Sequence, residues 1–210
     1  MSLRDRGQKT LRKDQRHKDS RPPVTSEIRK PTKAQLLAAY GKPVPDVIAP
    51  RLKVLFVGIN PGLYSGAVGH HFARPGNRFW PVLHKAKFTV QQLSPSEERE
   101  LLKHGYGITN IVNRSTAAAA ELDPRELKAG GRRLAAKITR YHPRVVAILG
   151  LAAFRVALGQ PKARFGPQQG RINASQIWVL PNPSGLNASY QIPELSRMFR
   201  KARIAAEKNS

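Results

Sequence analysis

The sequence of 210 residues contains no cysteine. This absence excludes disulfides, thiolate nucleophiles, iron–sulfur clusters and zinc sites that use cysteine. The six histidines show no HExxH pattern or other ligand spacing, and the glycine patterns of dinucleotide and P-loop binding are missing as well. We therefore expect neither a metal nor another cofactor.

Long apolar runs are also lacking. The longest, residues 145–153, is interrupted by Gly150 and is far shorter than a membrane-spanning helix. The first residues are basic, but no apolar stretch follows them, so they do not form a secretory signal. These features favour a protein that does not enter a membrane. We expect a cytoplasmic, nucleoid-associated protein of bacterial type.

Acidic residues are scarce: 13 Asp and Glu stand against 37 Lys and Arg, for a formal net charge of +24. Such an excess makes nucleic acid the first partner to consider and a membrane surface the second. Residues 1–30 hold ten Lys or Arg and four Asp or Glu with few large apolar residues. We interpret them as a mobile basic arm, either a plain solvated tail or an accessory DNA-binding arm. Residues 31–210 are expected to form one domain, and the protein is expected to be a monomer.

Apolar patterning and capping signals predict alternating strands and helices. Buried strands are expected at 52–59, 107–112, 144–149 and 176–180, and helices from Thr32, 77–87, from Ser94 to about Gly105, from Asp123, 152–158 and from about Pro193. This alternation predicts an α/β fold, with a mostly parallel sheet covered by helices on both faces.

Ligands of such sheets bind beyond the carboxyl ends of the strands. The first predicted strand is followed by GINPG (58–62) and the fourth by PNPSGLN (181–187). Each loop combines proline, which fixes φ, with glycine, which permits close approach of the backbone. Either loop alone is compatible with ordinary turn chemistry. Two at the same edge of one sheet favour a functional site.

These two loops, together with HFARPGNRFW (71–80), resemble the mismatch-specific uracil-DNA glycosylases, relatives of thymine-DNA glycosylase, over residues 46–203. The resemblance implies a three-layer α/β/α sandwich of the uracil-DNA-glycosylase type. It also implies a DNA-repair hydrolase that flips a nucleotide out of mismatched double-stranded DNA. Hydrolysis of the N-glycosidic bond of uracil, and by extension of thymine or ethenocytosine, would leave an abasic site.

Roles for individual residues follow from the same resemblance. Asn60 would position the hydrolytic water, and the base pocket would be formed by Ile59, Gly62, Ser65 and Phe72, with Phe72 stacking on the flipped base. Leu186 would be the wedge that fills the gap in the duplex. Gly185 and Asn187 would present backbone groups to the widowed guanine, while Asn182 and Ser184 would hold the loop or a flanking phosphate. Asn77 is interpreted as a helix cap. Ala188 departs from the family pattern, which has a basic residue there.

Neither loop contains a carboxylate, because no Asp or Glu occurs between Asp46 and Glu97 or between Glu126 and Glu194. A general base would have to come from Asp46, from residues 97–126 or from Glu194, and Glu97 and Glu126 are explained more simply as helix caps. An amide that only positions water predicts a slow enzyme, since general-base catalysis contributes about 10²–10⁴-fold.

Two other functional classes remain open from the residues alone. A noncatalytic basic nucleic-acid-binding protein fits the charge equally well, although the aromatic signature of RNA-binding RNP motifs is missing. A small-molecule nucleosidase would use carboxylates or calcium at the sugar, which the two loops do not supply.

Overall fold

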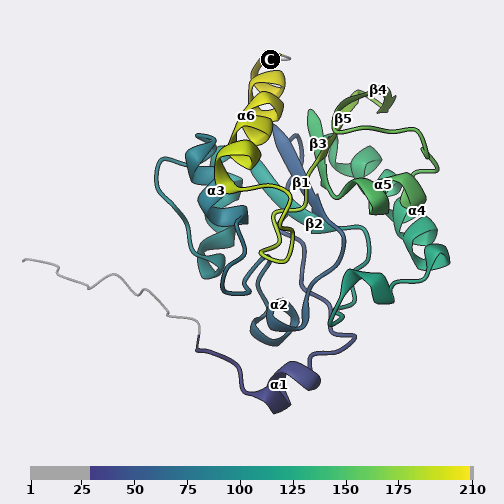
Figure 1. The fold of residues 1–210 in the computed structure, drawn as a ribbon. Helices are drawn as coiled ribbons and strands as arrows, with labels where there is room; N and C mark the ends of the chain where they lie inside the picture. Colours follow the sequence, from purple (N-terminus) through teal and green to yellow (C-terminus); the bar gives the residue numbers. More distant parts are fainter. Residues whose placement is uncertain (1–28, 209–210) are drawn as a thin grey trace, which may run out of the picture.

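Four short apolar segments form the parallel strands of a central sheet (Figure 1). In the computed structural model, which describes residues 29–208, they are β1 (Val54–Gly58), β2 (Tyr106–Asn110), β3 (Val145–Leu149) and β5 (Ser175–Leu180). The strand order is β2-β1-β3-β5-β4, and β4 (Gly166–Ile172) is antiparallel to β5. Every residue of β1, β2 and β3 is buried, as is typical of parallel strands covered on both faces.

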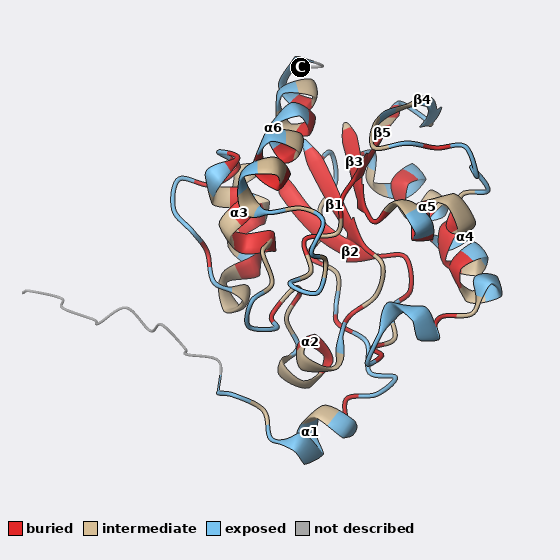
Figure 2. Ribbon diagram, viewed as in Figure 1, coloured by how far each residue is buried: buried red, intermediate tan, exposed pale blue. Residues whose placement is uncertain are grey.

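Helices cover both faces of the sheet and confirm the predicted three-layer α/β/α fold (Figure 2). Successive side chains of a strand point to opposite faces, so Phe56 packs with α3 (Phe79–Lys85) and α6 (Ile192–Lys208). Its neighbours Leu55 and Val57 pack on the other face with α4 (Pro124–Tyr141) and α5 (Leu151–Ala157). The two cores hold the sheet rigidly beneath the loops at its carboxyl edge.

The predicted capping signals are confirmed in the shorter and longer helices alike. Thr32 and Gln35 form the reciprocal bonds that start α1 (Lys33–Leu37). The Ser94 N–H donates to Glu97 at 2.8 Å, but the helix that follows, η1 (Pro95–His104), is of the 3₁₀ type. Asp123 caps α4. Within residues 29–208, no helix is long and apolar enough to cross a membrane.

The structure adds three elements that the sequence pattern does not predict. β4 consists of Gly, Pro, Gln and Arg residues with a single Ile at its end, and its largely exposed side chains show no apolar alternation. α2 (Leu63–Val68) begins at Gly62, which has no capping side chain, and the short 3₁₀ helix η2 (Ala119–Glu121) begins at Ala118, where only Glu121 bonds the cap N–H, at 2.7 Å. The predicted basic arm falls mostly on residues 1–28, which lie outside the described residues.

Gly130 packs α4 against the end of β2 so closely that an added methyl group should destabilise the protein. A Cβ at this position would lie 2.4 Å from the carbonyl oxygen of Ile111 and 2.8 Å from its Cγ2. Alanine normally stabilises a helix by about 1 kcal/mol relative to glycine. Here overpacking should instead lower the free energy of unfolding of Gly130→Ala by about 1–3 kcal/mol, measured by urea denaturation.

The control is Ala136→Gly at an exposed position of α4, which should cost only about 0.5–1 kcal/mol. A Gly130→Ala variant as stable as the wild type would contradict the close approach of α4 to Ile111.

Candidate active site at the carboxyl ends of the strands

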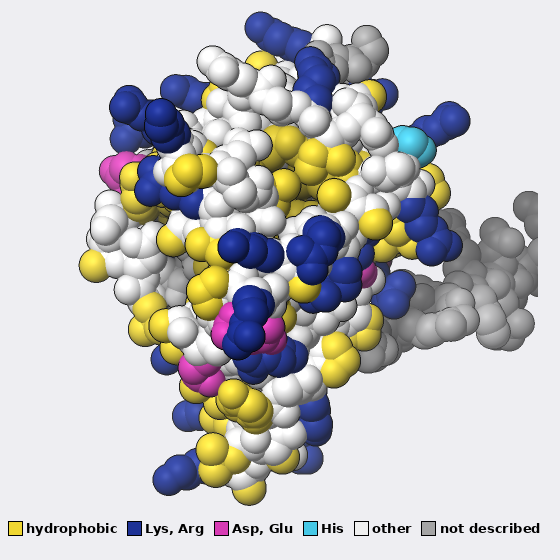
Figure 3. Space-filling model, turned by 90° about the vertical axis from the view of Figure 1, so that its right-hand side faces the viewer, with side chains coloured by type: hydrophobic (Ala, Val, Ile, Leu, Met, Phe, Trp, Pro, Cys, Tyr) yellow, Lys and Arg dark blue, Asp and Glu magenta, His cyan; other side chains and the backbone are white. Residues whose placement is uncertain are grey.

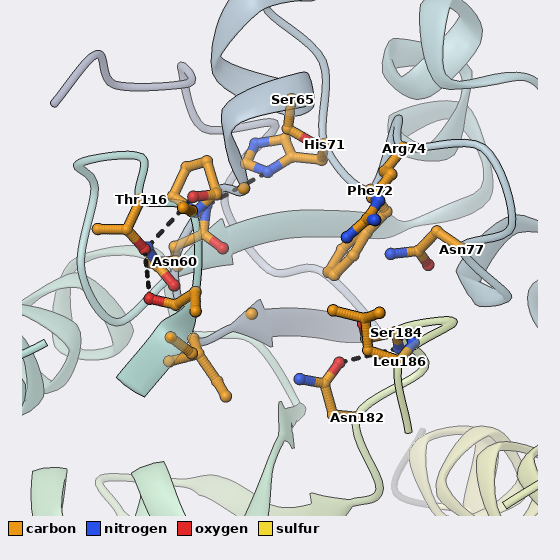
Figure 4. Close-up of a pocket in the computed structure, with 18 of the residues that line it drawn as sticks. Asn60, Ser65, His71, Phe72, Arg74, Asn77, Thr116, Asn182, Ser184 and Leu186 are labelled. Atoms are coloured by element: carbon orange, nitrogen blue, oxygen red, sulfur yellow. Dashed lines mark hydrogen bonds between the residues drawn. The ribbon is translucent and has the colours of Figure 1, made fainter. Parts of the chain in front are cut away.

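A cavity of about 430 Å³ opens where β1, β2 and β5 end (Figure 4). Its wall comes from the segments that follow these three strands and from the loop before α3. Of the residues predicted for the site, all line the cavity except Gly185, which packs against the backbone of Gly76. The topology therefore brings together the two loops that the sequence analysis singled out.

Asn60 is held by its amide nitrogen. Nδ2 donates to the Arg114 carbonyl oxygen at 3.1 Å, to Thr116 Oγ1 at 2.7 Å and to the Pro61 carbonyl oxygen at 3.2 Å. Because carbonyl oxygens only accept hydrogen bonds, these contacts fix which end of the amide is the nitrogen. Among the described residues nothing donates to Oδ1, so this oxygen remains free to accept a hydrogen bond at the cavity.

The segments that follow β1 and β2 meet at Asn60 and are joined through their backbones. The Ile111 and Val112 N–H groups donate to the carbonyl oxygens of Gly58 and Ile59, each at 2.9 Å. Farther along, Thr116 donates to Pro61 at 3.1 Å and accepts from Leu63 at 3.1 Å. The hydrogen-bonded pairing of β1 with β2 thus continues past the strands into the site.

An ion pair with α4 supports the segment that holds Asn60. Arg114 donates Nε to Glu126 Oε1 at 2.7 Å and Nη2 to Oε2 at 2.8 Å, a bidentate arrangement. These hydrogen bonds from Arg114 lower the pKa of the Glu126 carboxyl to about 2. Glu126 also accepts from the Asp123 N–H at 3.2 Å. The predicted cap is confirmed, and the same carboxylate has a second role that the sequence did not indicate.

Phe72 forms a wall of the cavity in a backbone conformation that non-glycine residues rarely adopt. Its φ is 53°, and its ring stacks on Phe79 with a centroid distance of 4.0 Å. Ser65 Oγ accepts from the Ala73 N–H at 3.1 Å and so holds the adjacent backbone. The half-buried ring has one face on the core and remains accessible from the cavity.

His71 orients a second asparagine at the cavity. The Pro45 carbonyl oxygen lies 2.9 Å from His71 Nε2, which must therefore carry a proton. Burial lowers the pKa of His71, an effect that the nearby Glu98 carboxylate opposes, and the neutral ring leaves Nδ1 as an acceptor. Nδ1 lies 3.4 Å from Asn110 Nδ2, so Asn110 Oδ1 lies on the opposite side of the amide, close above Gly58.

No aspartate or glutamate is among the residues that line this cavity in the described part of the chain. Asp46 accepts from Thr109 Oγ1 at 2.7 Å and pairs with Lys137. Glu98 accepts from the His71 N–H at 2.8 Å, and Glu194 from the Gln191 N–H at 3.0 Å. The carboxylates that the sequence left open as bases are thus engaged outside the cavity.

The loop after β5 is built by its own polar side chains. Asn182 Oδ1 accepts from the Ser184 N–H at 3.0 Å, and Asn187 Nδ2 donates to the Asn182 carbonyl oxygen at 3.0 Å. Ser184 Oγ accepts from the Leu186 N–H at 3.3 Å. The Leu186 side chain is 73% exposed at the loop tip. The polar side chains therefore hold the loop, and the apolar one projects from it.

Basic side chains cover much of the surface beside the site. Figure 3 shows Lys and Arg spread from one end to the other of the face that carries α4 and α5, with fewer acidic side chains at separate places among them. On α4 the exposed basic residues are Arg125, Lys128, Arg132, Arg133 and Arg140. This distribution favours a polyanionic partner.

Sequence reasoning missed several residues of the site, namely His71, Arg74, Asn110 and Thr116. Asn110 lies within the second predicted strand (107–112) and Thr116 follows it, but their place beside Asn60 depends on β2 pairing with β1, which the pattern alone does not determine. His71 and Arg74 lie within the segment quoted for the family resemblance. Asn77 Oδ1 accepts from the Phe79 N–H at 2.9 Å, so the side chain bonds the first residue of α3 as a cap would, but the N-cap position itself is Arg78 and Asn77 also lines the cavity.

The Arg114–Glu126 pair predicts a pH-dependent contribution to stability. The pKa of Glu126 is lower in the folded chain, about 2, than its ordinary value of 4.5. The pair therefore stabilises the folded protein above about pH 4.5, and this contribution is lost as the pH falls towards about 2. The Tm of Glu126→Gln should lie below that of the wild type near neutral pH, and the difference should shrink on acidification.

Glu100→Gln is the control, because within residues 29–208 Glu100 pairs only with the exposed Lys103, and its loss should change Tm little at any pH. A Tm difference for Glu126→Gln that stays constant between neutral and acidic pH would contradict this prediction.

Comparison with known proteins identifies the family to which this geometry belongs. Residues 45–205 match the model of the uracil DNA glycosylase superfamily. The fold is similar to the solution NMR structure of a proposed uracil DNA glycosylase from Methanosarcina acetivorans, with a TM-score of 0.53 and 18% identity over 77% of this chain and 98% of that one. The match spans the sheet, the acid-free cavity and both loops at its rim, and the chain therefore belongs to the uracil DNA glycosylase superfamily.

Proposed function

We propose that this protein hydrolyses the N-glycosidic bond of uracil in mismatched double-stranded DNA, with thymine and ethenocytosine as further candidate bases. The observation that carries the proposal is the anchored amide of Asn60, whose free Oδ1 meets a cavity without carboxylates. Membership in the superfamily supports the reaction class. The net charge of +24 supports DNA as the partner.

The cavity would receive the flipped nucleotide. Its volume of about 430 Å³ is in the range of small-molecule pockets, and Phe72 offers an aromatic face for stacking. Stacking on an aromatic side chain contributes about 1–3 kcal/mol per base. With Nδ2 directed at His71, Asn110 would use Oδ1 to accept a hydrogen bond from N3–H of uracil. Cytosine has an acceptor at this position and would leave the pair unsatisfied.

Asn60 would position the water that attacks C1′ of the sugar. An amide oxygen accepts a hydrogen bond but is too weakly basic to remove a proton effectively. This arrangement suits a reaction in which the bond to the base breaks early and the sugar becomes cationic before water adds. Thr116 would keep Oδ1 in place, because its hydroxyl accepts from Nδ2 and donates to the Ala118 carbonyl oxygen at 2.8 Å.

Leu186 would enter the duplex as the base leaves it. An exposed apolar side chain at the tip of an internally bonded loop is suited to this role, because such wedges offset the cost of unstacking with new contacts. Leu186 also lines the cavity, on the side of Phe72 and away from Asn60 (Figure 4). Gly185, next to it, would present its backbone N–H to the widowed guanine and favour a mismatch. The predicted backbone contact from Asn187 does not fit the structure, because its N–H donates to the Ser184 carbonyl oxygen at 3.0 Å and its carbonyl oxygen accepts from Arg78.

The test of this function measures abasic sites, by alkaline cleavage, in labelled G·U duplex, A·U duplex and single-stranded uracil DNA. We expect single-turnover cleavage of G·U duplex by the wild type and a loss of about 10²-fold in Asn60→Ala, because the water is no longer positioned. Asn113→Ala, an exposed asparagine outside the cavity, is the control and should retain the wild-type rate.

An Asn60→Ala variant with the full rate would overturn the role of Asn60. If the wild type formed no abasic sites on any substrate, the protein would instead be a noncatalytic nucleic-acid-binding protein.

Leu186→Ala should reduce excision from duplex DNA much more than excision from single strands, since a single strand has no gap to fill. The loss of a wedge that offsets unstacking by about 1–3 kcal/mol corresponds to about 10- to 100-fold on duplex. Val90→Ala, at a side chain that is 90% exposed, is the matched control. Equal losses on both substrates would exclude the wedge.

A further inference from the structure

The loop that carries Leu186 is tied together by one side chain from another part of the chain. Arg78, immediately before α3, donates through its backbone N–H to the Pro183 carbonyl oxygen at 3.0 Å. Its guanidinium donates to the carbonyl oxygens of Pro183 (Nε, 3.4 Å), Asn187 (Nη2, 2.6 Å), Ser184 (Nη2) and Tyr190 (Nη1). Both limbs of the loop 183–190, hereafter the wedge loop, therefore converge on one cation.

These carbonyl oxygens are the only polar partners of the Arg78 guanidinium among the described residues, and no carboxylate there neutralises it. Carbonyl dipoles alone compensate the charge, so each contact is a charge-assisted hydrogen bond of the stronger kind. The planar guanidinium has five donors in a fixed fork, whereas a lysine ammonium is a single point with three. Lysine at position 78 could not reach both limbs of the wedge loop together.

The arrangement also determines the outward face of the wedge loop. In a trans peptide the C=O and the following N–H point in opposite directions. Because Arg78 draws the carbonyls of Ser184 and Asn187 towards itself, the N–H groups of Gly185 and Ala188 point away from it. In the described chain neither N–H has an acceptor, so the Ser184–Gly185 and Asn187–Ala188 peptides, one on each side of Leu186, offer free donors to a ligand.

A second contact aligns the wedge loop with the segment before α3. A Cβ at Gly185 would lie 2.6 Å from the Gly76 carbonyl oxygen, so the two backbones pack directly on each other. Gly76 itself has a φ of 80°, which favours glycine. Residues 76–78 thus form the platform on which the wedge loop rests.

We propose that Arg78 is a positioning residue that holds the wedge loop in the form competent for duplex DNA and so sets the preference for duplex over single strands. The inference rests on the proposed function. Arg78 acts through Leu186 and the free N–H groups of the wedge loop.

The experiment compares Arg78→Lys and Arg78→Ala with the wild type in single-turnover excision from G·U duplex and from single-stranded uracil DNA. Losing charged hydrogen bonds should lower the duplex rate about 10- to 100-fold, more in Arg78→Ala, and leave the single-strand rate within about threefold. Fluorescence of 2-aminopurine beside the target uracil should show reduced flipping in both variants. Arg155→Ala is the matched control, since Arg155 also bonds a loop carbonyl, that of Ala163, but lies away from the cavity.

The double variant Arg78→Ala, Leu186→Ala separates positioning from general destabilisation. Because Arg78 acts in part through Leu186, the duplex loss of the double variant, expressed as a free energy, should be smaller than the sum of the two single losses. Additive losses, or equal losses on duplex and single strands, would overturn the proposal.

Hydrogen exchange provides a readout that does not depend on catalysis. The amides of residues 184–190 should exchange faster in Arg78→Lys than in the wild type or Arg155→Ala. Unchanged exchange there would overturn the positioning role even in an active enzyme. Faster exchange in a protein inactive on every substrate would contradict the proposed function and the duplex role, while confirming that Arg78 holds the loop.

Discussion

The parallel pairing of β1 with β2 determines where the side chains of the site lie. Gly58 pairs with Asn110 at the last position of the two strands, and the hydrogen bonds continue beyond them to join Ile59 with Val112 and Pro61 with Thr116. A shift of one residue would turn Asn110 to the other face of the sheet. It would also remove the carbonyl and hydroxyl groups that hold the amide of Asn60. The strands are short, but the backbone bonds past their ends make this edge of the sheet a rigid frame.

Carboxylates contribute to this site indirectly, by holding other residues in place. Glu126 holds Arg114, whose carbonyl oxygen in turn holds Asn60. Glu98 accepts from the backbone of His71, and Asp46 bonds Thr109, the neighbour of Asn110. Each of these carboxylates holds a residue at or next to the cavity, and the cavity wall itself carries amides, hydroxyls, an uncharged imidazole and the side chain of Arg74, with no acid among its described residues. A site of this composition favours binding and orientation of polar groups over the transfer of protons.

The sequence allowed the sheet and its carboxyl-edge loops to be predicted because their signals are local. Runs such as 145–149 are continuous and apolar, which indicates a buried strand. Asp123 with Glu126 forms a capping pattern that indicates the start of a helix. The family resemblance then supplied roles for Asn60 and Leu186. The contacts of Thr116 with Asn60 and of Arg78 with the wedge loop span 56 and about 110 residues, and they exist only because the fold closes those distances. β4 was not predicted for a different reason, since its polar, exposed residues show no periodic apolar pattern.

The polar strand β4 limits how readily separate molecules associate through the edges of their sheets. The inner strands are short, apolar and β-branched, a composition that extends readily into sheets between molecules when an edge is open. At one margin β4 covers β5 with a strand whose register shifts between Pro167 and Arg171, and a proline there cannot donate to a further strand. At the other margin Val47 forms two backbone bonds with Ile108 of β2. An incoming strand therefore finds no straight, regular edge on either side of the described sheet, and the apolar interior is shielded from edge-to-edge aggregation.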